Sequence, residues 1–468
     1  MSKKPNFLFL FSDQHRGDWM PYDSEIKRQL GVENLELNMP TIRALMDNGT
    51  SFTHAVTPAP ICAPARACLA AGKRYKNCRV PVNQVNYDPN LEPFYKKLNV
   101  AGYYVCGVGK FDLNKGDLYW GNGYHEVLER SGFSHTMDSE GKMDTIWAAL
   151  QKKPGLYGQL LLKNNLLEQH IEDMIKRGGG DHPTPLPDEF YADNWVTQNG
   201  IDMLENMPKD QPWFMQVNFS GPHDPWDITV SMKEAVKDRS FPIAADCTDE
   251  KNKGVRQNYA AMIENIDKNM GLIIEAVKRR GDYENTIIVY SSDHGEMMGD
   301  HNLYGKSKPE QGSIHIPLVI DASRFGGVKG KSNRTPVELQ DLAVTFLDYA
   351  ELSPESSLES MSLRPIVAGE SDKVRDYAIS ELITPNPTGL YNTFGTISDG
   401  KYKLIMRNGA QDRLYDLSVD PFECSDISQS NQETVEKLKK AFGERGQRPN
   451  PVAAAYAQAF SVYGSNRK

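Results

Sequence analysis

Cysteine is scarce in this sequence. Six cysteines occur in 468 residues, at positions 62, 68, 78, 106, 247 and 424, and none of them forms a Cys-x-x-Cys pair. These are too few for a disulfide framework in a chain of this size. No pair of Cys or His residues has the short separation that is typical of a structural zinc site. The fold must therefore be stabilised by an ordinary hydrophobic core, which a chain of this length can build.

An excess of basic residues and long apolar runs are also absent. The formal net charge is -9 and the pI is near 5.7, which argues against nonspecific nucleic-acid binding, because that function needs a strongly basic surface. No stretch of about twenty apolar residues occurs, so no transmembrane helix is expected. We therefore expect neither a nucleic acid nor a membrane among the partners.

The N-terminal region lacks the pattern of a secretory leader. The apolar run 6–11 leads into Ser12, Asp13 and Gln14, with no small-residue cleavage site. This run is interpreted as a first buried strand and not as a signal peptide. As written, the chain is expected to be cytoplasmic, or periplasmic if a leader has been removed from it.

Strand and helix patterns alternate over most of the chain. Strands are predicted at residues 6–11, 51–56, 103–109, 213–219, 286–290 and 317–320. Helices are predicted between them at residues 39–48, 91–101, 193–207, 259–280 and 341–349. This alternation predicts an α/β fold whose sheet is mostly parallel and flanked by helices.

The patterns divide the chain into two parts. Residues 1–365 carry the α/β alternation and form the predicted main domain. Within it, the irregular stretch 111–190, with a helix pattern at 156–176, is predicted to be an insertion that shapes a pocket. In residues 366–468 a small α+β subdomain is predicted, from short strands at 393–397, 402–406 and 413–417 and a helix at 432–444.

One short motif points to chemistry. Pro64 follows Cys62 by two residues, which predicts the first turn of a helix, because proline is tolerated where the backbone N–H has no helical partner. Cys62 would then lie at the positive end of the helix dipole with Arg66 one turn further on, an arrangement that suits a nucleophile beside an anion. The alternative is a buried structural thiol, because free cysteine is often buried.

Polar side chains follow four of the predicted strands at the points where these strands end. The residues are Asp13, Gln14, Lys110, His223, Asp293 and His294. Taken singly, each has a plain structural explanation, such as a helix cap or a solvated loop. Because the carboxyl ends of parallel strands meet at one edge of a sheet, all six are expected to share one crevice.

The donor atoms in this group suit a divalent cation. Asp13, Gln14 and Asp293 offer hard oxygen ligands for Ca²⁺, Mg²⁺ or Mn²⁺, and His294 adds a nitrogen that favours Mn²⁺ or a mixed site. A divalent ion beside Cys62 would activate a nucleophile and polarise an oxyanion. Further positive charge would come from Arg66, Lys110, His223 and Lys306. The pattern therefore predicts a pocket for a tetrahedral oxyanion ester.

Several longer motifs carry a resemblance to a known family. They are Cys62-x-Pro64-x-Arg66 with Gly72, Ser12-Asp13-Gln14, Gly109-Lys110, Pro222-His223-Asp224-Pro225, Ser292-Asp293-His294-Gly295-Glu296 with Gly299-Asp300-His301, and Gly305-Lys306-Ser307. With these motifs in order over residues 5–350, and Leu414-Tyr415-Asp416-Leu417 in the tail, the chain resembles the type I sulfatases of the alkaline phosphatase superfamily. The resemblance implies an alkaline phosphatase-like α/β sandwich, with a large mixed, mostly parallel sheet in a catalytic domain and a small C-terminal α+β subdomain.

The resemblance implies a sulfate ester hydrolase for a sulfated carbohydrate or another small organic sulfate. In that family the cysteine, here Cys62, is converted to formylglycine by a formylglycine-generating or an anaerobic sulfatase-maturating enzyme, and a hydroxyl of its hydrate attacks sulfur. Ca²⁺ is the first choice of metal, with Mn²⁺ or Mg²⁺ as alternatives. The implied ligands are Asp13, Gln14, Asp293, His294 and the oxygen derived from Cys62.

The resemblance also implies roles for the remaining candidates. His223 or Lys306 would assist the leaving alcohol, and Arg66 and Lys110 would orient the hydrate and offset developing charge. The metal motifs look most like the branch that contains choline sulfatases and phosphonate monoester hydrolases. In that branch an asparagine placed like Asn83 contacts the bound oxyanion, and Lys110, His223 and Lys306 are expected to bind substrate as well.

Asp112 departs from the family pattern. The family commonly has Gly-Lys-x-His, whereas this chain has Gly109-Lys110-Phe111-Asp112. Asp112 could serve as the base that opens the hemiacetal, or another group could take that step.

Two other functions remain open from sequence: a phosphonate monoester or phosphodiester hydrolase with the same site, and a noncatalytic oxyanion- or glycan-binding relative in which Cys62 stays unmodified.

Overall fold

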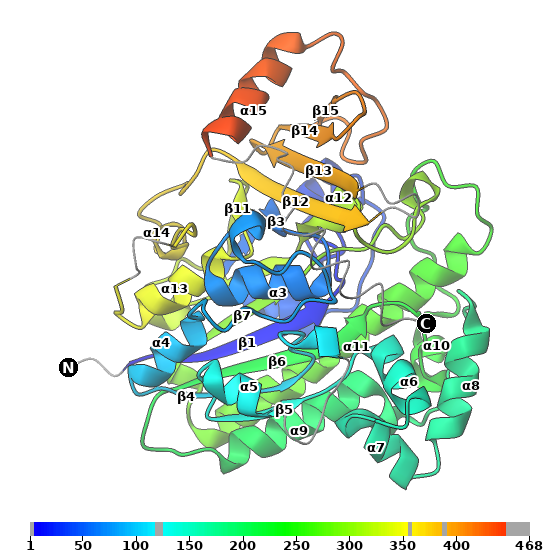
Figure 1. Cartoon of the computed structure of the whole chain (residues 1–468), viewed down its shortest axis with the longest axis vertical. Helices are drawn as coiled ribbons and strands as arrows, with labels where there is room; N and C mark the ends of the chain where they lie inside the picture. Colours follow the sequence, from blue (N-terminus) through cyan, green and yellow to red (C-terminus); the bar gives the residue numbers. More distant parts are fainter. Residues whose placement is uncertain (1–3, 118–124, 354–357, 386–390, 446–468) are drawn as a thin grey trace.

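An eight-stranded sheet forms the centre of the computed structural model (Figure 1), which describes residues 4–117, 125–353, 358–385 and 391–445. The strand order is β10–β2–β9–β7–β1–β6–β4–β5. Only β9 runs antiparallel to its neighbours in this sheet, so the predicted mixed, mostly parallel α/β sheet is confirmed. The strands are β1 (Asn6–Asp13), β2 (Thr50–Phe52), β4 (Tyr104–Gly109), β5 (His135–Asp138), β6 (Trp213–Pro222), β7 (Thr286–Ser292), β9 (Leu318–Asp321) and β10 (Lys331–Asn333).

Strand β1 shows why the sheet is covered on both faces. Leu8 and Leu10 belong to one hydrophobic core, whereas Phe7, Phe9 and Phe11 belong to another. All five side chains are fully buried. A strand with helices on both sides needs apolar residues at every position, and the run predicted at 6–11 is therefore the buried centre of the fold.

Helices form the two outer layers (Figure 1), which gives a three-layer α/β/α sandwich. One layer contains α2 (Pro40–Asn48), α9 (Ala192–Asn206), α10 (Val230–Val236) and α11 (Asn252–Arg280). The other contains α3 (Cys62–Ala71), α4 (Phe94–Val100), α13 (Asp341–Tyr349) and α14 (Arg364–Val367). Short helices α1 (Ser24–Gln29) and α12 (Gln311–Ile314) lie in connections.

No described helix is long and apolar enough to cross a membrane.

The prediction of one continuous strand at 51–56 is wrong. Two short strands occur instead: β2 in the central sheet, and β3 (Ala55–Val56) in a three-stranded sheet. In the latter, β3 lies between β8 (His315–Ile316) and β11 (Val337–Glu338). Every residue of the run 51–56 is buried, so the hydrophobic pattern carries no mark of the change of sheet.

The described part of the stretch 111–190, predicted to be irregular with one helix, contains four α-helices. It contains α5 (His125–Arg130), α6 (Lys142–Leu150), α7 (Leu156–Lys163) and α8 (Leu167–Arg177). The single helix predicted at 156–176 is therefore wrong, because the chain breaks at Asn165, whose φ is 58°. This stretch also supplies β5, which pairs with β4 at the edge of the sheet.

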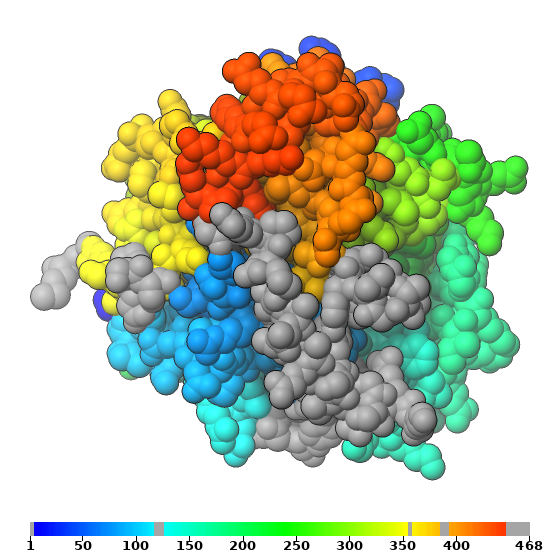
Figure 2. All heavy atoms as spheres, turned by 45° about the horizontal axis from the view of Figure 1, so that its top comes forward, coloured from blue at the N-terminus to red at the C-terminus, as the bar shows by residue number. Residues whose placement is uncertain are grey.

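The C-terminal subdomain is a four-stranded antiparallel sheet covered by one helix. Its elements are β12 (Ala378–Pro385), β13 (Tyr391–Ser398), β14 (Tyr402–Arg407), β15 (Arg413–Asp416) and α15 (Gln432–Glu444). The last three strands and the helix were predicted, whereas β12 was not. Leu382 and Phe394 of this sheet belong to one buried hydrophobic cluster with Ala67 and Cys68 of α3. Figure 2 shows the subdomain, in orange and red, lying directly on the rest of the molecule.

Candidate active site

The four central parallel strands bring the predicted polar residues to one edge of the sheet. These strands are neighbours in the order β7–β1–β6–β4. At their carboxyl ends lie Asp293 and His294, which follow β7, Asp13 and Gln14 at the end of β1, His223 after β6, and Lys110 after β4. The convergence expected from the sequence is therefore present in the structure.

Helix α3 brings Cys62 to the same edge from one face of the sheet. Cys62 is the first residue of α3, as predicted, and the helix ends at Gly72 in a left-handed conformation with φ 61°. All residues of α3 are buried, and Cys62 is 0% exposed. Asn83 Oδ1 accepts a hydrogen bond from Ala63 N at 3.0 Å, which satisfies one of the free N–H groups at the start of the helix.

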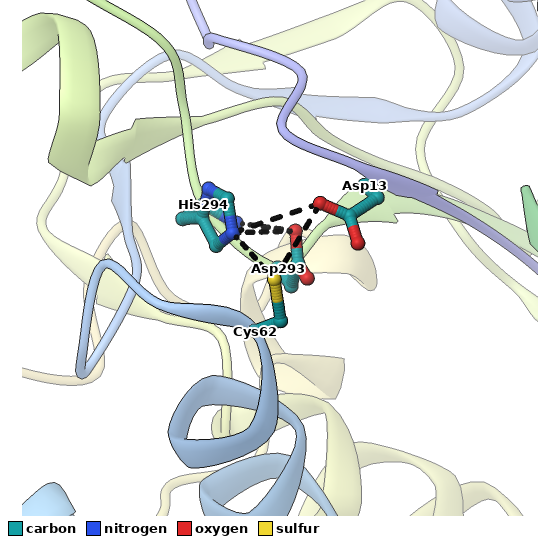
Figure 3. A group of neighbouring side chains, drawn as sticks. All are labelled: Asp13, Cys62, Asp293 and His294. Atoms are coloured by element: carbon teal, nitrogen blue, oxygen red, sulfur yellow. Dashed lines mark hydrogen bonds and ion pairs between the residues drawn. The ribbon is translucent and has the colours of Figure 1, made fainter. Parts of the chain in front are cut away.

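Asp13, Cys62, Asp293 and His294 form a compact cluster (Figure 3). One ligand atom from each side chain lies within 4.8 Å of the others. The Cys62 Sγ is 3.3 Å from His294 Nε2 and 3.8 Å from Asp13 Oδ1. His294 Nε2 is 3.6 Å from Asp13 Oδ1 and 3.7 Å from Asp293 Oδ1. Side chains from β1, α3 and the end of β7 thus point into one small volume.

Gln14 presents an unsatisfied oxygen beside this cluster. Its Nε2 donates to Asp224 Oδ1 at 2.9 Å and to Glu296 Oε2, and these two acceptors fix the orientation of the amide. The Gln14 Oε1 is buried without a hydrogen-bond partner among the described residues. Such an oxygen costs free energy unless a ligand satisfies it. Asp224 and Glu296 belong to the motifs that follow β6 and β7. Their spacing in the sequence did not reveal that they hold the Gln14 amide.

The donor atoms of the site fit a divalent cation. Two carboxylates, one amide oxygen and one imidazole nitrogen form a mainly hard set of ligands. The Cys62 thiol is the exception, because soft sulfur is a poor partner for a hard cation. An oxygen at the same position would complete the set, so the site fits the metal better with Cys62 converted than with Cys62 as encoded.

Lysine side chains surround the Cys62 sulfur with positive charge. Lys306 Nζ lies 3.0 Å from Sγ, and Lys110 Nζ lies 3.5 Å from it. Burial and the Asp13 carboxylate raise the pKa of the Cys62 thiol, but Lys110, Lys306 and His294 outweigh them and hold this pKa well below its ordinary value. The site is therefore built to stabilise negative charge at this position.

The position of Lys110 depends on a glycine. Gly109 ends β4 with φ 94°, and a Cβ there would lie 2.0 Å from Asn218 O. Only glycine permits this close approach and turn. Lys110 Nζ also contacts Asp13, which couples it to the cluster.

Arg66 contacts the carboxylates of the cluster. Its Nε donates to Asp293 Oδ2 at 2.9 Å, Nη2 lies 3.4 Å from Asp13 Oδ2, and Nη1 donates to the carbonyl of Lys110. The residue is 3% exposed. The anions that Arg66 faces in the structure are therefore the carboxylates, whose orientation it fixes.

Asp112 lies one contact away from the sulfur. Its Oδ2 is 3.3 Å from Lys110 Nζ and 3.0 Å from Lys115 Nζ, and Lys115 Nζ is 2.6 Å from Asp144 Oδ2. The Asp112 Oδ1 is buried, with no hydrogen-bond partner in the described part of the chain. Asp112 thus anchors Lys110 through a network with Lys115 and Asp144 that the sequence did not reveal.

His223 and Lys306 contact each other on the more open side of the site. Lys306 Nζ donates to His223 Nε2, and His223 Nδ1 donates to the carbonyl of Asp224. The His223 side chain is 17% exposed, whereas Cys62 is fully buried. Lys306 therefore links the sulfur to a histidine that reaches solvent.

Two family models match the sequence of this chain. A sulfatase family model matches residues 5–352, and a model described as N-sulphoglucosamine sulphohydrolase, C-terminal, matches residues 299–447. An arylsulfatase of Clostridium perfringens is 26% identical over 475 residues, with 93% of each chain covered. A choline-sulfatase of Rhizobium meliloti is 25% identical, with 93% of this chain and 84% of that protein covered.

Solved structures share the fold along nearly the whole chain. The phosphonate monoester hydrolase of Agrobacterium radiobacter has a TM-score of 0.78 at 22% identity, with 94% of this chain and 96% of that chain covered. A protein solved with its substrate D-glucosamine-2-N,6-O-disulfate has a TM-score of 0.74 at 19% identity, with 94% and 97% covered. Since the family model spans most of the sequence and relatives along its length are sulfatases, the chain belongs to the sulfatase family of the alkaline phosphatase superfamily and is a sulfuric ester hydrolase.

Proposed function

We propose that this enzyme removes sulfate from a sulfated carbohydrate or another small organic sulfate at the cluster around Cys62. The observation that carries this proposal is the position of Cys62 at the start of α3, 3.0 Å from Lys306 Nζ and among three metal-ligating side chains. An arylsulfatase and a choline-sulfatase among the relatives, and a structural neighbour bound to a sulfated glucosamine, support this substrate class.

Two cofactors are proposed: a divalent cation, which the donor atoms suit, and formylglycine, which the sulfatase family implies. Asp13, Gln14, Asp293 and His294 would hold a divalent cation, with Ca²⁺ as first choice because oxygen ligands dominate, and with Mn²⁺ or Mg²⁺ as alternatives. Formylglycine made from Cys62 by a formylglycine-generating or an anaerobic sulfatase-maturating enzyme would supply the oxygen nucleophile, which the cation polarises.

The protein's cationic and amide groups bind the ester. Lys110 and Lys306 flank position 62 and offset charge on the sulfate oxygens, because preorganised donors are most effective in a buried site. The Asn83 side chain contacts Ala63 in the first turn of α3, and its amide N–H groups would donate to the sulfate oxygens. Arg66 acts through the carboxylates that it orients.

Proton transfer is assigned to three residues. Either His223 or Lys306, which contact each other, donates the proton that the departing alcohol oxygen takes up. Asp112 holds Lys110 in place. Its Oδ1, which has no hydrogen-bond partner among the described residues, would accept the proton of the second hydroxyl of the hydrate when sulfate is expelled.

A substrate panel tests the proposed function. The purified enzyme, with formylglycine at position 62 verified by peptide mass spectrometry, should turn over sulfate esters with a higher kcat/KM than phosphonate monoesters or phosphodiesters. The opposite ratio would support the alternative hydrolase. Inactivity of the verified enzyme on aryl, choline and sugar sulfates would overturn the assignment.

Replacing His223 with glutamine should slow hydrolysis of alkyl sulfates about 10²- to 10⁴-fold and that of activated aryl sulfates much less. The reason is that an alkoxide needs a proton as it leaves, whereas an acidic phenol does not. The measurement is kcat across esters whose alcohols span a range of pKa values. His182→Gln is the matched control, because His182 is 55% exposed and pairs with Asp173. An equal loss of kcat on every ester would contradict the role of His223 in protonating the leaving alcohol.

A further inference from the structure

A second cluster of metal-ligating side chains lies apart from the active site. Asp246, His301 and Cys424 each place one ligand atom within 4.8 Å of the others. They belong to three separate segments: the connection between α10 and α11, the short helix η5 (Asp300–Asn302), and the chain after β15 in the C-terminal subdomain. The cluster therefore lies where the subdomain meets the catalytic domain.

The contacts of His301 leave one ring nitrogen available. Its Nε2 donates to the carbonyl of Phe422 at 2.7 Å, so Nδ1 carries the lone pair. This Nδ1 lies 3.9 Å from Asp246 Oδ2. Metal-binding histidines commonly donate their other N–H to a carbonyl or carboxylate in this way. The fold thus sets the tautomer that metal binding requires.

Hydrogen bonds also fix the backbone of the other two ligands. Asn302 Nδ2 donates to the carbonyl of Asp246 at 2.8 Å, which ties the Asp246 segment to η5. Cys424 N donates to Asp420 Oδ1 at 3.0 Å, which shapes the turn after β15. Because these bonds hold the backbone of both segments, rotation of the exposed side chains can bring the three ligand atoms closer together.

The ligand types select a different metal from that of the active site. One imidazole nitrogen, one sulfur and one carboxylate oxygen form a borderline-soft set, which suits Zn²⁺ much better than Ca²⁺ or Mg²⁺. The Asp246 side chain is 68% exposed and Cys424 is also exposed, so water can occupy a fourth position of a tetrahedral site.

We propose that Asp246, His301 and Cys424 form a zinc-binding site that ties the C-terminal subdomain to the turn preceding Lys306. Binding transfers the proton of the Cys424 thiol to solvent and forms bonds from Zn²⁺ to Sγ, Nδ1 and a carboxylate oxygen. Zinc–ligand bonds are about 2.0–2.3 Å long, so the three ligand atoms, which lie within 4.8 Å of one another, must move closer together. The exposed Asp246 and Cys424 side chains have room for that movement.

Cobalt(II) absorption tests the proposal in the full-length protein. The parent for this experiment is Cys62→Ser, because an unconverted Cys62 could itself bind Co²⁺ through sulfur. Reduced Cys62→Ser protein should bind Co²⁺ with a thiolate-to-cobalt charge-transfer band, and Zn²⁺ should displace the Co²⁺ and raise the midpoint of thermal unfolding.

Matched variants assign the signal. In the Cys62→Ser parent, adding Cys424→Ser should abolish the band and the Zn²⁺-dependent thermal shift, and adding His301→Gln should weaken Co²⁺ binding at least about tenfold. Adding Cys247→Ser, which removes the cysteine next to Asp246, should leave both signals intact. Absence of the band in the parent, or a band that survives the loss of Cys424, would overturn the proposal.

Discussion

Cys62→Ala is expected to remove sulfatase activity while the protein still folds. Loss of the residue that provides the nucleophile should reduce kcat on the order of 10⁵- to 10⁶-fold, as with other enzymes whose nucleophile is deleted. The neighbouring lysines and carboxylates remain in place, so the variant should still bind the ester. The measurement is kcat on an aryl sulfate together with the midpoint of thermal unfolding.

Cys68→Ala is the matched control for this variant. Cys68 belongs to the same helix and is equally buried, but it packs against the C-terminal subdomain rather than the metal cluster. Its replacement should change stability and leave kcat within a few-fold of the parent value. Retention of full activity by Cys62→Ala would show that the nucleophile lies elsewhere.

Removing divalent cations should reduce activity at least about 100-fold, and adding Ca²⁺, Mn²⁺ or Mg²⁺ back should restore it. Replacement of groups around metal ligands alone costs about 10- to 100-fold, and loss of the ion itself removes polarisation of the nucleophile. The measurement is kcat/KM after dialysis against a chelator, with metal content followed by elemental analysis. The cation that restores most activity at the lowest concentration identifies the preferred metal.

Asp293→Asn should show the same loss without recovery at the metal concentration that restores the parent enzyme. This change removes one negative charge from the cluster, and it also weakens the pairing with Arg66 at 2.9 Å. Asp372→Asn is the control, because the Asp372 side chain is 95% exposed. Full activity in metal-free enzyme, verified by elemental analysis, would contradict a catalytic metal.

The fold was largely predictable because local patterns record burial. The unbroken apolar run before Asp13 marks a strand covered on both faces, and Pro64 marks the start of α3. The break at Asn165 was missed although Asn164-Asn165 is a local turn signal, since asparagine tolerates the left-handed conformation. The division of 51–56 between two sheets was not predictable, because it depends on which distant strand each residue pairs with.

The site was predictable to the extent that strand topology determines it. Parallel neighbours bring Asp13, Lys110 and Asp293 to one edge, whatever the detailed packing. The orientation of the Gln14 amide and the anchoring of Asp112 depend on hydrogen bonds between segments far apart in sequence. No spacing rule within one segment contains that information.

The complete burial of Cys62 has a consequence for the proposed conversion to formylglycine. Its thiol has no exposed surface, and the C-terminal subdomain packs on α3 through Leu382 and Phe394. If a maturating enzyme converts Cys62 as proposed, it must reach the side chain before Lys110, Lys306 and His294 have closed around it. A molecule that completes folding first would remain inactive until it unfolds. The yield of active enzyme would then depend on the rate of Cys62 conversion relative to the rate of folding.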